Sequence, residues 1–61
     1  MKKIQIYRQA KGLTRRELAE AIGVTKRAAE AIEHRGVNGV RAEMAVKIAE
    51  ALGCSVKDLI D

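Results

Sequence analysis

The stretch ELAEAIGVTKRAAEAI, residues 17–32, decides the fold of this chain. Apolar residues recur at steps of three and four on both sides of Gly23, which predicts two amphipathic helices joined by a turn. Gly23 permits the positive φ that a tight turn needs, and the small Ala19, Ala28 and Ala29 allow the two helices to cross closely. Val24 follows the turn and is expected to fill the corner. The pattern favours a helix-turn-helix, although an ordinary helical hairpin would also need the glycine.

Capping residues predict where the helices around this corner begin. Thr14 and Glu17 have the spacing of a capping box, and Thr25 precedes the next helix as an N-cap. The segment SVKD at 55–58 is a second capping box, whereas HRGVNGV at 34–40, with two glycines and an asparagine, is typical of a loop. The sequence predicts one all-α domain over residues 1–61 with five helices, at residues 2–11, 15–22, 26–34, 42–52 and 56–60.

The composition excludes several kinds of site. Cys54 is the only cysteine and His34 the only histidine, so one chain holds neither the pair needed for a disulfide nor the ligands of a zinc cluster. No apolar run has the length of a signal peptide or of a membrane span. Because a lone cysteine is typical of the reducing cytosol, we expect a cytoplasmic protein without a metal or another cofactor.

Basic residues are concentrated in the first part of the chain. The protein carries 12 lysines and arginines against eight acidic residues, a net charge of +4, and nine of those 12 lie within residues 1–36. Such an excess favours a polyanionic partner, although a small domain can also carry surplus lysine for solubility. Charge alone leaves both interpretations open.

Two adjacent cations begin the helix predicted at 26–34. Lys26 and Arg27 lie at its N-terminus, where the backbone dipole is positive and anions are favoured. Their presence costs some helix stability, which indicates that something external needs them. Lysine and arginine are also the side chains suited to the O6 and N7 acceptors of guanine in the major groove. The pattern favours contact with bases or phosphates over a merely solvated helix face.

Nearly the whole chain, residues 4–60, resembles the Cro/cI-type helix-turn-helix family of phage and bacterial transcription regulators. The resemblance rests on Arg8 within IYRQAKGLT, on ELAEAIGVT, on Ile32-Glu33 and on MAVKIAEALGCSVKDLI, in this order. It implies a compact five-helix, lambda-repressor-like fold in which the second and third helices form the helix-turn-helix. The segment RAEMAVKIAEALG is also similar to antitoxins of the same fold.

The resemblance implies roles for individual residues. In the family the third helix reads base edges from its first turns, and the residue that opens the second helix contacts phosphate and base. The residues assigned to DNA binding on this basis are Arg15, Arg16, Thr25, Lys26, Arg27, Glu30, Ala31, His34 and Arg35. A family arginine in the first helix pairs with the glutamate that closes the third, which implies a structural ion pair between Arg8 and Glu33.

The chain departs from the family pattern between Glu33 and Leu52, a stretch that is about one residue longer than usual. The extra residue falls within 34–40, a loop that commonly contacts the sugar-phosphate backbone in the family. At position 31, alanine has no hydrogen-bonding group and is suited at most to a thymine methyl.

These observations predict a sequence-specific double-stranded DNA-binding regulator that represses transcription by covering its operator. An enzyme is not expected, because the chain has no paired carboxylates in a plausible pocket, no serine or cysteine near a histidine and no glycine-rich phosphate loop. The alternative is an antitoxin-like or adaptor module whose main partner is a protein.

A single recognition helix reads only a few base pairs, so we expect a homodimer on a pseudo-palindromic site. Its two recognition helices would lie about 34–36 Å apart. The last helix, with Val56, Leu59 and Ile60, and the loop residues Val37 and Val40 are the candidates for the dimer contact. The alternative is that Val56 and Leu59 close the core of one chain.

Overall fold

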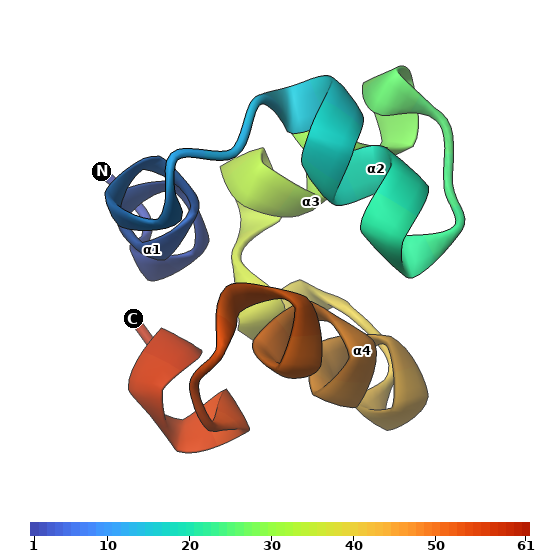
Figure 1. Cartoon of the computed structure of the whole chain (residues 1–61). Coiled ribbons are helices and arrows are strands. Elements are labelled where there is room, and N and C mark those ends of the chain that lie inside the picture. Colours follow the sequence, from blue (N-terminus) through green and yellow to red (C-terminus); the bar gives the residue numbers. More distant parts are fainter.

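The computed structural model describes residues 1–61 and contains helices but no strands. Its four α-helices are α1 (Lys3–Lys11), α2 (Arg15–Ile22), α3 (Lys26–Arg35) and α4 (Ala42–Leu52). Two 3-10 helices, η1 (Val37–Gly39) and η2 (Val56–Leu59), lie on either side of α4 in the chain. In Figure 1, α2 crosses in front of α3 at the top, α4 lies below them, and α1 and η2 are on the left. The all-α prediction is confirmed.

The corner between α2 and α3 has the predicted construction. Gly23 has φ 76°, in the left-handed region, and the amide of Val24 donates to the Ala19 carbonyl at 2.9 Å. A Cβ at Gly23 would meet no atom within 4 Å, so the positive φ, and not a close approach, is what requires glycine there. Ala19 and Ala29 are both buried, and Val24 packs against the core. The two helices and their turn form the expected helix-turn-helix.

Side-chain caps hold the starts of α2 and α3. The Glu17 amide donates to the Thr14 hydroxyl at 3.0 Å, and the Thr14 amide donates to the Glu17 carboxylate at 2.8 Å, so this capping box is confirmed. The Ala28 amide donates to the Thr25 hydroxyl at 3.1 Å. Each helix of the helix-turn-helix therefore begins at a fixed residue.

The last predicted helix, at residues 56–60, is present but is not a fifth α-helix. The segment is a 3-10 helix of four residues, with the Asp58 amide bonded to the Ser55 carbonyl at 3.1 Å. At the other end the Ile60 amide donates to the Lys57 carbonyl at 3.3 Å, so the bonds that bound the segment join residues three apart, as in a 3-10 helix. The expected capping box between Ser55 and Asp58 is present. Hydrogen bonds from Ser55, chiefly from its backbone amide, lower the pKa of Asp58.

Residues 34–40 are more regular than the predicted loop. α3 continues through His34 and Arg35, because the Gly36 amide still donates to the Ile32 carbonyl at 2.8 Å. Gly36 then turns the chain, with φ 88° and ψ 171°. The 3-10 helix η1 follows, and its first residue, Val37, is buried. The helix predicted at 26–34 is therefore one residue longer than expected, and the loop prediction is wrong for η1, where the buried Val37 anchors the segment to the core.

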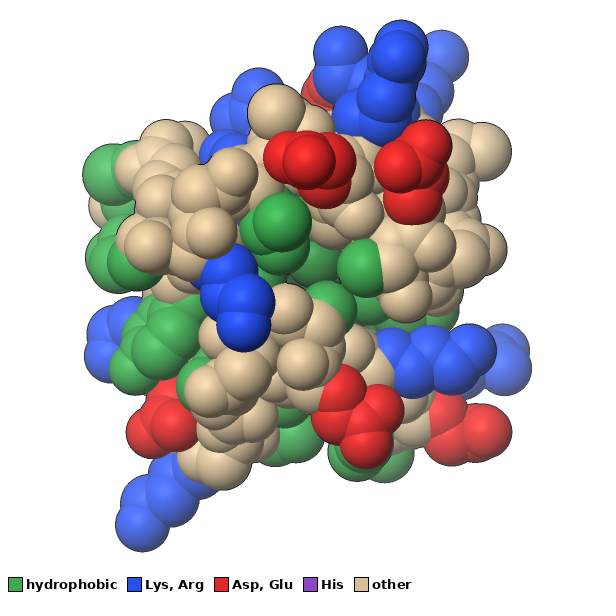
Figure 2. Space-filling view, in the orientation of Figure 1, with side chains coloured by type: hydrophobic (Ala, Val, Ile, Leu, Met, Phe, Trp, Pro, Cys, Tyr) green, Lys and Arg blue, Asp and Glu red, His purple; other side chains and the backbone are tan.

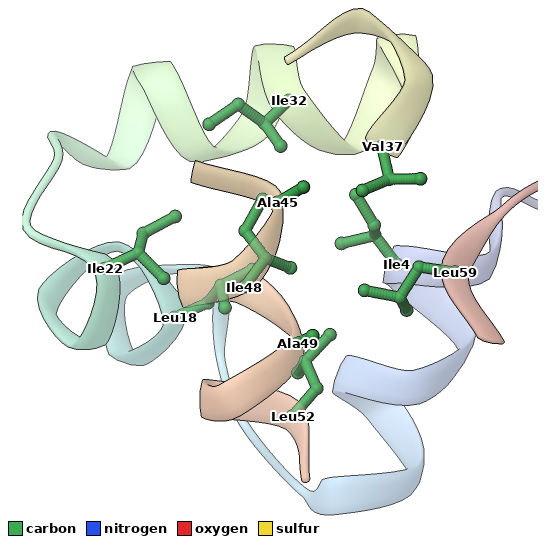
Figure 3. Close-up of a cluster of buried hydrophobic side chains, with 10 residues drawn as sticks. All are labelled: Ile4, Leu18, Ile22, Ile32, Val37, Ala45, Ile48, Ala49, Leu52 and Leu59. Atoms are coloured by element: carbon green, nitrogen blue, oxygen red, sulfur yellow. The ribbon is translucent and has the colours of Figure 1, made fainter. Parts of the chain in front are cut away.

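One apolar cluster connects the helices, as Figure 3 shows. Its largest fully buried side chains come from α1, α2, α4 and η2 and are Ile4, Leu18, Ile48 and Leu59. Because Leu59 is 0% and Val37 is 3% exposed, the prediction that these two contribute to a dimer contact is wrong. Leu59 closes the core of a single chain, as the alternative expected, whereas Ile60 is 49% exposed.

Candidate nucleic-acid interface

The first turn of α3 presents two free cations. Thr25 caps this turn, so Lys26 and Arg27 follow directly after a fixed helix start. Both residues are exposed, and neither lies within ion-pair distance of a carboxylate. The turn contains no acidic residue, so the two side-chain charges add to the positive end of the helix dipole. The start of α3 is therefore suited to an anion outside the chain.

The start of α2 lies beside the start of α3. One shallow depression is lined by residues of α1, α2 and α3 and by the cap of α2, none of them apolar: Arg8, Thr14, Arg15, Arg16 and Lys26. Figure 2 shows Lys and Arg side chains gathered at the top of the molecule, over α2 and the start of α3. Arg16, like Lys26, has no ion-pair partner. Two helix N-termini and several cations thus meet at one surface, which favours binding of phosphate groups.

Glu33 connects this surface to the interior. Its Oε2 accepts a hydrogen bond from Arg8 Nε, and its Oε1 accepts one from Arg15 Nε at 3.3 Å. A second Arg8 nitrogen, Nη1, donates to the Leu13 carbonyl at 2.6 Å. Arg8 and Glu33 are the only buried charged residues, and no buried polar side-chain atom lacks a hydrogen-bond partner. The pair ties α1 to α3, and Arg15 adds a link to α2.

The outer side of α3 carries the other residues assigned from the resemblance. Glu30, Ala31, His34 and Arg35 are all exposed helix residues. A second depression runs beside this part of α3 and is lined by Met1, Lys2, Gln5, Arg15, Glu30, Glu33, His34 and Asp61. The structure thus brings Arg15, Arg16 and Lys26 to one depression, and Glu30 and His34 to its neighbour. Thr25, Arg27, Ala31 and Arg35 line neither depression.

Two contacts near this surface were missed by the sequence analysis. One is the hydrogen bond between Arg15 and Glu33, which are 18 residues apart. The other caps α1, because the Lys3 amide donates to Asp61 Oδ1 at 2.7 Å. Lys2 provides no side-chain cap, so the only signal in the sequence is that α1 lacks a capping residue of its own. The acceptor is 58 residues away and has no local signature.

The remaining histidine, cysteine and acidic side chains form no metal site or reactive thiol site. No group of three histidine, cysteine or acidic side chains is placed to hold a metal ion. Burial raises the pKa of the Cys54 thiol, and the Asp58 carboxylate adds to the increase while Lys11 opposes it. This thiol is therefore protonated at neutral pH. None of the helices combines the length and the hydropathy needed to cross a membrane.

Comparison with known proteins identifies the family. A family model described as helix-turn-helix matches residues 4–59, which include α2, the turn at Gly23 and α3. No match was found among curated proteins, and none was found among solved structures. The matched family consists of regulators that bind DNA and not of enzymes. The chain therefore belongs to the helix-turn-helix family of DNA-binding transcription regulators of the Cro/cI (XRE) type.

Proposed function

We propose that this protein binds a specific sequence of double-stranded DNA, with α3 in the major groove, and represses transcription by covering its operator. The observation that carries the proposal is the pair of exposed, unpartnered cations Lys26 and Arg27 at a capped helix start. The cationic depression at the start of α2 lies beside them. A repressor of this kind would act in the same compartment as the DNA, the cytoplasm of a bacterial cell.

Lys26 and Arg27 have the chemistry for base readout. Their donors match the O6 and N7 acceptors of guanine, and Glu30, one turn further along α3, can accept a hydrogen bond from cytosine N4. Ala31 is suited to a thymine methyl. The hydroxyl of Thr25 is already engaged as a cap, so we assign it to positioning of the first turn at the DNA surface.

Arg15 and Arg16 are assigned to phosphates. They occupy the first turn of α2, where side-chain charge and helix dipole both attract an anion. His34 and Arg35, at the exposed end of α3, are assigned to the backbone further along the same strand. Contacts of this kind fix the register of the protein on the duplex but carry little sequence information.

The proposal is tested by fluorescence anisotropy on mixed-sequence duplex DNA and on duplexes selected from a random pool. We expect binding that weakens steeply between about 50 and 200 mM salt, because counterions are released from the phosphates. Arg27→Gln should lower affinity for the selected duplex by roughly tenfold and relax the preference at one base pair. Lys26→Gln should have a similar effect at a second base pair, whereas Arg16→Gln, which removes a phosphate contact, should reduce the slope of log K against log salt by about 0.9.

Lys57→Gln is the matched control, because Lys57 is an exposed, unpaired cation on η2, outside both depressions. Its effect on affinity should stay within about twofold. If the control and the α3 variants lost equal amounts of DNA affinity, binding would be explained by diffuse electrostatic attraction alone and not by contacts of α3. Absence of binding at low salt would contradict the proposal and favour the adaptor alternative, in which α3 meets a protein.

A further inference from the structure

Both ion pairs of the molecule share the carboxylate of Glu33, with one oxygen for each arginine. The side chain of Glu33 is 4% exposed, and that of Arg8 is 9% exposed. The side chain of Arg15 is 43% exposed. The network therefore has a buried end at Arg8 and an open end at Arg15, at the start of α2.

Arg15 uses only one of its five N–H donors in this network, the one on Nε. The structure contains no other hydrogen bond from its side chain, so both terminal nitrogens are free. Arg15 is the one residue that lines both the cationic depression and its neighbour beside α3, whereas Glu33 lines only the neighbour. Its free donors are thus placed on the surface proposed to meet DNA.

The charges of the network also favour an anion at Arg15. Arg8 and Glu33 compensate each other in the buried part, so the charge of Arg15 is the surplus that faces solvent. A guanidinium held through Nε presents its terminal nitrogens as a planar fork, which matches two oxygens of one phosphate. Because the side chain is held before binding, less rotamer entropy is lost when the phosphate arrives.

We propose that Glu33 is a positioning residue for Arg15, holding the guanidinium so that its two terminal nitrogens bind one phosphate of the duplex. This inference rests on the proposed DNA-binding function. It gives Glu33 a role at the interface in addition to the tie between α1 and α3. Glu33 itself touches no DNA and acts only through Arg15.

A double-mutant cycle between Arg15→Gln and Glu33→Gln tests the inference, with affinity for one selected duplex as the readout. Removing the Glu33 charge makes the protein more positive, which by itself strengthens binding to DNA. We expect the opposite, a loss of roughly threefold to tenfold, because Arg15 is no longer held. Arg15→Gln should cost about tenfold in the unmodified background and less than about twofold beside Glu33→Gln.

Arg16→Gln is the matched control, because Arg16 lines the same depression but has no link to Glu33. Its cost should be the same in both backgrounds. Stronger binding by Glu33→Gln, or an equal cost of Arg15→Gln in both backgrounds, overturns the positioning role and leaves DNA binding intact. Failure of the unmodified protein to bind duplex DNA at low salt overturns the proposed function, and this inference with it.

The helix signal in circular dichroism checks that each variant is folded. If Glu33→Gln unfolds, the unmodified protein still provides a test through the Nε–Hε resonances of its arginines in NMR. The Arg15 resonance should be slow to exchange in the free protein and should stay so when duplex is added. Loss of this protection on DNA binding would mean that Glu33 releases Arg15, which contradicts the positioning role.

Discussion

Glu33 is as deeply buried as the apolar core residues, although it is charged. Such a side chain is tolerated only because both of its oxygens accept hydrogen bonds from arginines. The two arginines are not equivalent partners, since Arg8 is buried with the carboxylate while Arg15 is substantially exposed. The loss of stability on removing one of these three side chains therefore depends on which charge is left without a partner.

Alanine substitutions at Glu33, Arg8 and Arg15 should lower the free energy of unfolding by decreasing amounts, in that order. Glu33→Ala leaves the buried Arg8 without a carboxylate and should lower the free energy of unfolding by about 3–5 kcal/mol. Arg8→Ala should cost about 3 kcal/mol, because Arg15 still pairs with Glu33. Arg15→Ala should cost less than about 1 kcal/mol, since solvent screens the exposed pair. Urea denaturation followed by circular dichroism measures all three, and equal costs for Glu33→Ala and Arg15→Ala would contradict this account.

Among the helices, α3 has the C-terminal end at which glycine is hardest to replace. Gly36 follows it with φ 88° and ψ 171°, a conformation that is essentially confined to glycine. A Cβ at Gly36 would lie 2.6 Å from Asp61 Oδ2, and the other oxygen of the same carboxylate caps α1. The end of α3 and the start of α1 are thus coupled through the side chain of Asp61.

Gly36→Ala should therefore be more harmful than the same change at another helix end. Gly12, after α1, also has a positive φ, but a Cβ there would meet nothing within 4 Å. We expect Gly12→Ala to cost about 1–2 kcal/mol and Gly36→Ala about 3 kcal/mol, from strain and from displacement of Asp61. Thermal denaturation compares the two variants. The excess cost at Gly36 should shrink in an Asp61→Ala background, and no difference between the two glycines would refute the coupling.

For the molecule as a whole, the surface has little exposed apolar area from which a dimer interface could form without DNA. A standard interface takes about 800 Å² from each partner, roughly a fifth of the 4022 Å² that this chain exposes. Only four large apolar side chains remain exposed, and they are Met1, Ile6, Val46 and Ile60. The cationic surface over α2 and α3 in Figure 2 repels a second copy of itself.

We therefore predict a monomer in free solution and two copies on a duplex with two half-sites. Sedimentation velocity at micromolar concentration, with and without such a duplex, measures both states. Half-sites about one helical turn apart place the two copies on the same face of the DNA and should support pairing. Moving one half-site by about 5 base pairs places them on opposite faces and should abolish cooperative binding. A stable dimer without DNA, or one copy per duplex at both spacings, would contradict the prediction.

Local signals in the sequence were sufficient for most of the fold. The capping box at Thr14 and Glu17, the N-cap at Thr25 and the turn at Gly23 are properties of neighbouring residues, so pattern and spacing reveal them. The same signals placed Lys26 and Arg27 at an exposed helix start. They did not reveal the type of the last helix, where Ser55 caps a 3-10 helix and not an α-helix.

Only the tertiary structure decided which distant groups meet. Nothing in the local pattern reveals that Glu33 serves Arg15 as well as Arg8, or that Asp61 caps α1, because these contacts depend on how three helices cross. Packing also took Val37 and Leu59 into the core and left Ile60 outside. Helix ends follow from hydrogen bonds between near neighbours, whereas the orientation of the Arg15 guanidinium follows from the relative placement of α2 and α3.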